Sequence, residues 1–236
     1  MTTAAQAPTP TADPAPRSAR RAQTRERLMA AATAVFAERG VIGASVEEIC
    51  EAAGFTRGAF YSNFADKDSL VLALIEAGVA AQYTAAERAV DELRSLSGSR
   101  SPAELVSQTL TRFEAMGQPS RESVLAQHEL MLHAARVPAL QAAYTAFQEV
   151  CATRLHDLIG DALQVAGLEF VLPFDQALEL LVATHDHVQA QLLFRATTDS
   201  SPLQTLIMAI TRPVTGTGPA ASADPNDLTT GQASLG

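Results

Sequence analysis

Signals for starting and ending helices recur along the whole chain, and they constrain its fold more than any other feature of the sequence. Apolar residues repeat at spacings of three and four, as they do along one face of an amphipathic helix. We find no stretch of alternating apolar and polar residues that is long enough to predict a strand. The sequence therefore predicts an all-α protein with about nine helices.

The first two predicted helices have explicit boundary residues. An apolar stripe predicts a helix over about residues 19–39, and Gly40 follows it as a terminator. Ser45 and Glu48 have the spacing of a capping box, in which each side chain bonds the backbone N–H of the other residue. A second, short helix is expected to begin there and to end at Gly54.

A third short helix and a long fourth helix are predicted next. Thr56 can cap the third helix, through which Phe60 and Phe64 repeat at i and i+4. Asp66 can cap the fourth helix, whose apolar stripe could continue to residue 96. Such a helix would be about 45 Å long at 1.5 Å per residue, so it would lead away from the three short helices.

Proline and glycine punctuate five further predicted helices. Their expected ranges are about 101–117, 120–135, 139–158, 173–196 and 201–212. The two ends of the chain, residues 1–16 and 213–236, are rich in small residues and proline, and we expect both to be disordered tails.

The charge is distributed unevenly along the chain. The formal net charge of −9 argues against a protein that coats nucleic acid or anionic membranes through bulk attraction. Residues 17–68, however, hold eight Lys or Arg residues and seven Asp or Glu residues, whereas residues 69–236 hold nine and eighteen. Five arginines between residues 17 and 27 face one acidic neighbour, Glu26. These arginines could contact DNA phosphates or simply belong to a solvated tail.

Cysteine usage and hydropathy indicate a cytoplasmic protein with no membrane partner. Cys50 and Cys151 lie far apart without CxxC spacing, so the sequence indicates neither a disulfide framework nor a zinc site. Cys50 lies on an apolar stripe and is expected in the core. The N-terminal residues lack the apolar region of a signal peptide, and no run reaches the roughly 18 uncharged apolar residues of a membrane span.

The three short helices have the arrangement of a helix-turn-helix unit, whose last helix enters the DNA major groove. The spacing of Phe60 and Phe64 turns them inward and leaves small and polar residues outside. Arg57 could pair with guanine, Asn63 could bond a base edge, and Tyr61 could reach a phosphate oxygen. The full set of expected DNA-binding residues is Ser45, Thr56, Arg57, Gly58, Ala59, Tyr61, Ser62, Asn63 and Lys67.

The segments RERLMAAATAVFAERG and VEEICEAAGFTRGAFYSNFADKDSLVLALI closely resemble the DNA-binding region of TetR-type transcriptional repressors, over residues 20–75. The resemblance implies a homodimer that reads a palindromic operator and a helical C-terminal domain that binds a small-molecule effector. It places the groove and phosphate contacts within the set above, from Arg57 to Asn63 and at Lys67. Ser62 and Asn63 depart from the residues usual at these places, which leaves the operator sequence open.

We therefore expect a helix-turn-helix domain over residues 17–66 and a helical effector-binding and dimerisation domain over residues 67–212. The resemblance assigns dimer contacts to the helices near 174–196 and 202–212. Their apolar stripes allow this role, although burial within one subunit would account for them equally well. The stripe residues are Leu178, Leu181, Val182, His185, Val188, Leu192, Leu203, Leu206, Ile207 and Ile210.

The downstream helices offer candidate ligand contacts but no enzymatic motif. The candidates are Phe113, His128, His133, Tyr144, Phe147, Phe174 and His185. The histidines lack the i, i+3 or i, i+4 spacing of a metal site on one helix, although His128 or His133 could meet His185 across helices. No GxSxG, P-loop, HExxH or GxGxxG motif occurs, so we expect neither an enzyme nor a bound cofactor.

Three alternatives remain open at this point. The three short helices could be a packing unit of a bundle, with Tyr61 and Phe64 in the core and Lys67 in solvent. The protein could regulate transcription without any ligand. It could also be an enzyme that uses His185 and Asp186 in a helical pocket.

Overall fold

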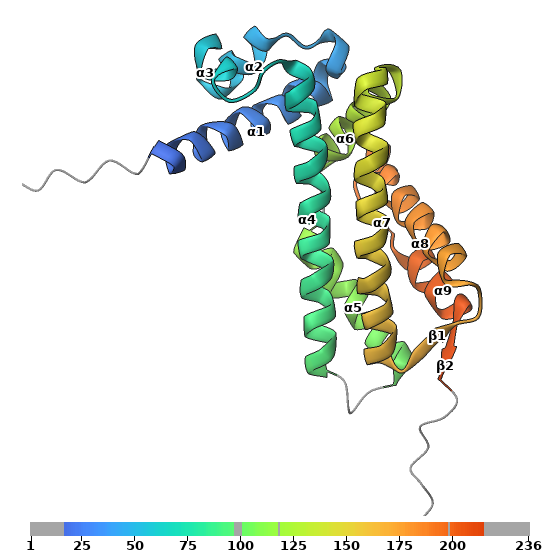
Figure 1. The fold of residues 1–236 in the computed structure, drawn as a ribbon. Helices are drawn as coiled ribbons and strands as arrows, with labels where there is room; N and C mark the ends of the chain where they lie inside the picture. The colour runs from blue at the N-terminus through green and yellow to red at the C-terminus, as the bar shows by residue number, and fades with distance from the viewer. Residues whose placement is uncertain (1–16, 97–100, 118, 198, 215–236) are drawn as a thin grey trace, which may run out of the picture.

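The computed structural model describes residues 17–96, 101–117, 119–197 and 199–214 (Figure 1). Within them the helices are α1 (Arg17–Gly43), α2 (Val46–Ala53), α3 (Arg57–Tyr61), α4 (Lys67–Leu96), α5 (Pro102–Gly117), α6 (Arg121–Arg136), α7 (Pro138–Ala166), α8 (Phe174–Ala190) and α9 (Ser201–Ile210). A 3-10 turn, η1 (Gln191–Leu193), follows α8. This architecture confirms the predicted all-α class. The predicted tail 1–16 and residues 215–236 of the predicted tail 213–236 lie outside the described residues. The start of the second tail was misplaced, because Pro213 belongs to strand β2 (Thr211–Pro213).

The caps predicted for the short helices are confirmed. Ser45 Oγ accepts a hydrogen bond from the Glu48 amide at 3.2 Å, and the Glu48 carboxylate accepts one from the Ser45 amide at 2.9 Å. Gly54 ends α2 in the left-handed region, with φ 70°. Thr56 Oγ1 accepts from the Ala59 amide at 3.2 Å and caps α3. Each of these bonds closes within four residues, which is why the local sequence specifies it.

Gly40 interrupts α1 as predicted, since its φ of 70° and ψ of 162° are not helical. A short helical piece follows before the chain turns into α2. An L-residue would be strained at this φ. A Cβ atom at Gly40 would also lie 2.8 Å from the Glu129 carboxylate of α6. The backbone conformation therefore favours glycine at this position, whereas the flexible Glu129 side chain could move aside.

The third helix is shorter than predicted. It ends at Tyr61, so Phe64 lies after α3 rather than within it. The hydroxyl of Ser62 and the side-chain amide of Asn63 each donate to the Ala59 carbonyl at 2.8 Å. Side chains that bond a backbone carbonyl in this way compete with continuation of the helix.

The prediction that the chain contains no strand was wrong. Two three-residue strands, β1 (Leu168–Phe170) and β2 (Thr211–Pro213), pair antiparallel, with Glu169 opposite Arg212. Three residues are too few to produce a recognisable alternation. The pairing also joins segments more than forty positions apart, so no local pattern could indicate it.

Two helix ends were also misplaced by the sequence prediction. α7 continues past Leu158, the last residue of its predicted apolar stripe, to Ala166, where Gly167 caps it with φ 65°. α8 ends at Ala190 rather than near 196, and the 3-10 turn η1 follows it directly. No glycine or proline marks the second boundary, so a continuous apolar pattern concealed it.

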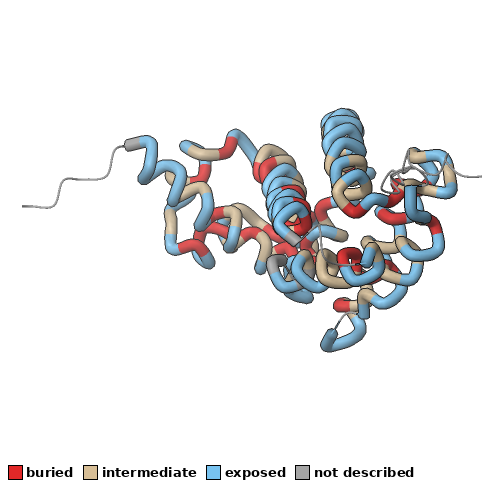
Figure 2. Tube along the Cα trace, turned by 90° about the horizontal axis from the view of Figure 1, so that it is seen from below, coloured by how far each residue is buried: buried red, intermediate tan, exposed pale blue. Residues whose placement is uncertain are grey.

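The first three helices, α1 to α3, lie at one end of a body in which α4 and α7 run along each other (Figure 1). Their core is continuous with the body, because α6 packs along α1 and adds side chains to the same apolar cluster. Buried residues occur both in the first three helices and in the body (Figure 2). The largest cluster includes Leu28, Phe36, Ile49, Cys50, Phe60, Phe64, Leu70, Ala126, Leu130 and Ala134. Cys50 is therefore a core residue, as predicted.

α4 is long and apolar enough, by length and composition alone, to span a bilayer. In this fold its buried residues Leu70, Val71 and Leu93 belong to the inward side of the helix, and α4 packs against α5 and α7. Only 22% of the apolar window of α4 is buried, so the core accounts for part of its apolar composition, and the absence of a membrane partner stays a prediction.

Candidate nucleic-acid interface

The outward face of α3 carries the residues that the sequence assigned to the DNA major groove. Phe60 is fully buried and Tyr61 is 49% exposed. Arg57 and Ser62 are exposed as well. The alternative in which Tyr61 belongs to a bundle core is wrong, because its ring extends into solvent while Phe60 anchors the helix from behind. The N-terminal turn of α3 thus offers its polar groups to a partner.

Arg57 is held by two neighbours on this face. Its Nη1 atom lies 2.7 Å from Glu47 Oε1 in α2. Its guanidinium carbon lies 5.9 Å from the centre of the Tyr61 ring. A hydrogen bond with Tyr61, followed by the charge of Glu47, raises the pKa of Arg57. The arginine is therefore charged and oriented before any partner binds.

Two arginines of α1 bond the C-terminal end of α3. Arg21 donates to the Ser62 carbonyl at 3.0 Å, and Arg25 donates to the Asn63 carbonyl at 3.1 Å. The Arg25 guanidinium also lies 4.3 Å from the centre of the Phe64 ring. Carbonyls after a short helix lack intrahelical donors, and cations stabilise that end. These side chains position α3 in addition to supplying positive charge.

Arg27 plays the same part for α2. It donates to the Ala53 carbonyl at 2.9 Å, and its guanidinium lies 4.6 Å from the centre of the Phe55 ring. The sequence suggested only phosphate contacts or a solvated tail for this arginine run. The structure instead uses Arg27 to tie α1 to the end of α2, which no local pattern indicated.

Asn63 is more constrained than the sequence suggested. Its Nδ2 atom donates to the Ala59 carbonyl at 2.8 Å and to Ser62 Oγ at 3.2 Å. Its Oδ1 atom is buried without a hydrogen-bond partner. The amide that could reach a base edge is thus engaged at the end of α3, and its contact with DNA stays a prediction.

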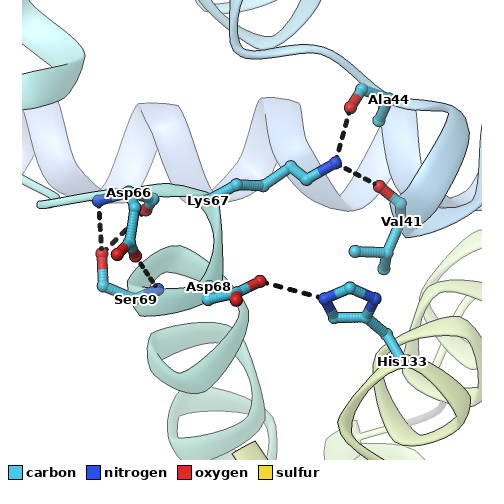
Figure 3. A network of polar contacts seen from close by, with 7 residues as sticks. All are labelled: Val41, Ala44, Asp66, Lys67, Asp68, Ser69 and His133. Atoms are coloured by element: carbon cyan, nitrogen blue, oxygen red, sulfur yellow. Dashed lines mark hydrogen bonds and ion pairs between the residues drawn. The ribbon is translucent and has the colours of Figure 1, made fainter. Parts of the chain in front are cut away.

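Lys67 bridges the turn between α1 and α2 (Figure 3). Its Nζ atom donates to the Val41 carbonyl at 2.7 Å and to the Ala44 carbonyl at 2.9 Å. The side chain is therefore not simply solvated, and two of its three N–H groups are already used. The pairing of Lys67 with the DNA backbone remains a prediction, and the two bonds to carbonyls give the residue a structural role as well.

The start of α4 is fixed on both sides of Lys67. Asp66 Oδ1 accepts from the Ser69 amide at 2.7 Å, which confirms the predicted cap. Asp68 Oδ1 lies 3.0 Å from His133 Nε2 of α6 (Figure 3). The helix that leaves the three short helices is therefore tied to them and to α6 within three residues.

Comparison with known proteins agrees with this geometry. Residues 28–74 match the family model described as bacterial regulatory proteins, tetR family. The transcriptional repressor BepR of Brucella suis biovar 1 (strain 1330) is 46% identical over 54 residues, which cover 23% of this chain and 26% of BepR. The N-terminal helices of this chain therefore match the TetR family. The chain spans about a quarter of the length of the curated relatives it matches.

Solved structures extend the likeness in fold beyond the TetR head, which we define as residues 17–66. A protein from Mesorhizobium loti MAFF303099, assigned to the TetR family, superposes with a TM-score of 0.60 at 19% identity and covers 80% of this chain and 94% of its own. FadR from Bacillus subtilis, solved with stearoyl-CoA, has a TM-score of 0.58 at 16% identity and covers 78% and 97%. At such identities the likeness concerns the fold alone. The relatives named by these comparisons are transcriptional regulators, not enzymes.

In the body formed by the later helices, part of the predicted ligand set converges. The Phe113 ring of α5 lies 5.7 Å from the His185 ring of α8, measured between centres. His128 of α6 and Tyr144 of α7 both interact electrostatically with Asp186, the neighbour of His185. Four helices thus bring aromatic and titratable groups to one region of the body.

The pKa values in this region are shifted by burial. Burial lowers the pKa of His185, against the opposing charge of Asp186. Burial raises the pKa of Asp186, against His185 and His128, although the residue as a whole is exposed. Burial, followed by the charge of Asp186, raises the pKa of Tyr144. Each of these shifts favours the neutral form of its group.

The other ligand candidates lie elsewhere. His133 pairs with Asp68 at the junction of α4 and α6. Phe174 packs its ring 4.0 Å from His156 and 5.2 Å from Phe170 beside β1. Phe147 is half-buried on α7. Among the residues that the structure describes, no three His, Cys, Asp or Glu side chains converge as a metal site would require.

The apolar stripes offered for a dimer seam are mostly buried within the chain. Leu178, Leu181, Val188, Leu192, Leu203 and Ile210 are all buried. Only Val182 of the stripe is exposed, at 37%. The exposed apolar residues of this region are instead Leu180, Phe194 and Met208, at 43%, 89% and 41%. Helical periodicity identified the stripe but could not say which face packs inside one subunit.

Proposed function

We propose that this protein is a DNA-binding transcriptional regulator, a repressor that binds a palindromic operator as a homodimer. The observation that carries the proposal is the outward face of α3, where Arg57 and Tyr61 are exposed and pre-oriented while Phe60 locks the helix to the core. A helix of this kind fits the major groove, which is about 12 Å wide. The family of the TetR head supports the same reading.

Binding to a palindromic operator requires two heads whose spacing matches the helical repeat of the DNA. Recognition helices must lie about 34 Å apart to enter successive major grooves on one side of the duplex. A second copy of the chain could supply the second head through α8 and α9. Support for this seam comes from Leu180, Phe194 and Met208, because these apolar side chains on or beside α8 and α9 are exposed and could be covered by a second copy.

We further propose that a small-molecule effector releases the protein from DNA. The group formed by Phe113, His128, Tyr144 and His185 is the candidate contact region. FadR, which has this fold, was solved with stearoyl-CoA. An effector that binds more tightly when the two heads are apart lowers operator affinity. The loss equals the difference between its binding free energies for the separated and the DNA-competent states, typically about 1–3 kcal/mol. Because α6 shares its core with α1, a shift of α6 would reach the head.

The central test is the loss of operator binding on Arg57→Ala. The operator is taken as a palindrome selected by the wild-type protein from random duplexes, and binding is measured by fluorescence anisotropy. We expect Arg57→Ala to weaken binding by about 1–3 kcal/mol, because a bidentate contact to guanine is lost. Thermal stability should change little, since exposed ion pairs contribute about 0–1 kcal/mol.

The matched control is Arg88→Ala, which removes the same charge from an exposed position on α4. It should bind the operator like the wild type. Equal affinities of wild type and Arg57→Ala, or an equal loss in Arg88→Ala, would show that Arg57 does not read DNA. Effector control is tested separately, by a thermal-shift screen followed by a DNA-release assay. If compounds that bind never change operator affinity, regulation without a ligand is the better account.

A further inference from the structure

We infer that Glu47 is a specificity-determining residue of the DNA-binding surface: its carboxylate holds the Arg57 guanidinium for a guanine edge and away from the phosphates. The inference rests on the proposed function, in which Arg57 contacts DNA. It gives a function to Glu47, an acidic side chain on a surface whose proposed ligand, DNA, is itself negatively charged.

The geometry joins the beginnings of the two helices of the helix-turn-helix unit. Glu47 lies in the first turn of α2, and Arg57 is the first residue of α3. Their side chains are 55% and 62% exposed, yet Nη1 and Oε1 lie only 2.7 Å apart. The centre of the Tyr61 ring lies 5.9 Å from the carbon of the same guanidinium. The arginine thus has two neighbours that restrict its orientation, a carboxylate and a ring.

Stability does not explain this ion pair. An exposed pair is worth about 0–1 kcal/mol in water, because screening and lost side-chain entropy offset the attraction. A carboxylate near DNA also repels every phosphate it approaches, whatever the sequence. Glu47 therefore lowers affinity for all duplexes, unless its partner gains something specific in return.

Arg57 can keep its ion pair with Glu47 while it contacts a base. The guanidinium has five N–H donors in a planar fork, and the ion pair occupies Nη1. Its remaining donors can reach the two acceptors of guanine in the major groove. With the carboxylate in place, swinging the guanidinium to a phosphate breaks an ion pair, whereas binding guanine does not. Glu47 thus penalises the contact that carries no sequence information.

The other acidic residues of α2 are placed differently. Glu48 is engaged in the capping box with Ser45 and lies 2.9 Å from Arg39. Glu51 is exposed one turn further along the helix and forms none of the ion pairs found among the described residues. Glu51→Gln therefore matches Glu47→Gln in charge, chemistry and helix, but not in contact with Arg57.

The test is a double-mutant cycle on full-length protein, with Glu47→Gln, Arg57→Gln, the double variant and Glu51→Gln as control. Dissociation constants are measured by fluorescence anisotropy on the selected palindrome and on a scrambled duplex of equal length, at two salt concentrations. We expect Glu47→Gln to bind the scrambled duplex more tightly. The ratio of specific to nonspecific affinity should fall by about threefold or more, as for directly coupled residues. In the Arg57→Gln background, Glu47→Gln should leave this ratio unchanged.

Glu51→Gln should leave the ratio as in the wild type. The inference is overturned if Glu47→Gln leaves the ratio unchanged, or if the ratio falls equally with Arg57 replaced, because either result reduces Glu47 to bulk charge. These failures differ from a failure of the proposed function. In that case the wild-type protein itself would not prefer any selected palindrome over the scrambled duplex.

Discussion

Replacing Lys67 by methionine separates two roles for the only lysine in the chain. The substitution keeps an unbranched apolar stem and removes the ammonium group that bonds the Val41 and Ala44 carbonyls at 2.7 and 2.9 Å. A hydrogen bond to a charged group contributes about 1.5–3 kcal/mol. Lys67 is itself half-buried, so water can replace part of the loss. We expect Lys67→Met to lower the free energy of unfolding by about 3 kcal/mol.

The expected change is large enough to measure by thermal unfolding. For a chain of this length, 1 kcal/mol corresponds to about 2–4 °C in Tm, so Tm should fall by about 6–12 °C. Binding to the selected palindrome is then measured below the new transition as a function of salt. If Lys67 also neutralises a phosphate, the slope of log K against log salt becomes shallower by about 0.9. We expect the slope to stay unchanged.

Lys67→Arg supplies the matched control, since it keeps the charge but replaces a compact ammonium with a planar fork. A tether to two carbonyls needs the ammonium geometry, so Lys67→Arg should lose part of the stability that Lys67→Met loses. A phosphate contact would tolerate the change. Unchanged Tm in both variants, with a shallower salt slope in Lys67→Met alone, would refute the structural role of Lys67.

Two further perturbations test other parts of the protein. Ser45→Ala removes the cap of α2, so it should lower the free energy of unfolding by about 1 kcal/mol and weaken operator binding. Ser101→Ala removes the comparable cap of α5 and should lower Tm without changing operator affinity. Equal effects of the two variants on operator affinity would contradict this expectation. Asp186→Asn should raise Tm at pH 7, because burial raises the pKa of Asp186 above 3.8 and its ionised form therefore destabilises the fold. That penalty appears as pH rises through the ordinary pKa and is complete above the folded-state pKa. The gain should therefore shrink toward pH 4, and a lower Tm of Asp186→Asn at pH 7 would contradict the assignment.

Caps and terminators were readable from the sequence because they act locally. The bonds of Ser45 with Glu48, and of Thr56 with Ala59, each span three residues. The residue types at these spacings carry the chemistry by themselves. The same holds for the inward direction of Phe60, which follows from helical periodicity. The exposed face of α3 was therefore predictable.

Contacts between distant segments decided the rest. Arg21 meets Ser62 across 41 positions, Lys67 meets Val41 across 26, and His133 meets Asp68 across 65. Each of these polar residues has several acceptors within its reach in an unfolded chain, and only the packing of α1 against α2 and α6 selects one.

The sequence alone thus determined where the helices begin, which side of α3 faces outward and which family the head belongs to, because those properties depend on neighbours within one or two turns. The tertiary structure alone decided that Arg21, Arg25, Arg27 and Lys67 bond backbone carbonyls. It also decided that the apolar stripes of α8 and α9 mostly face the inside of one subunit. The physical reason is that a side chain's partner depends on which helices pack together, and helix packing brings together residues that are far apart in the chain.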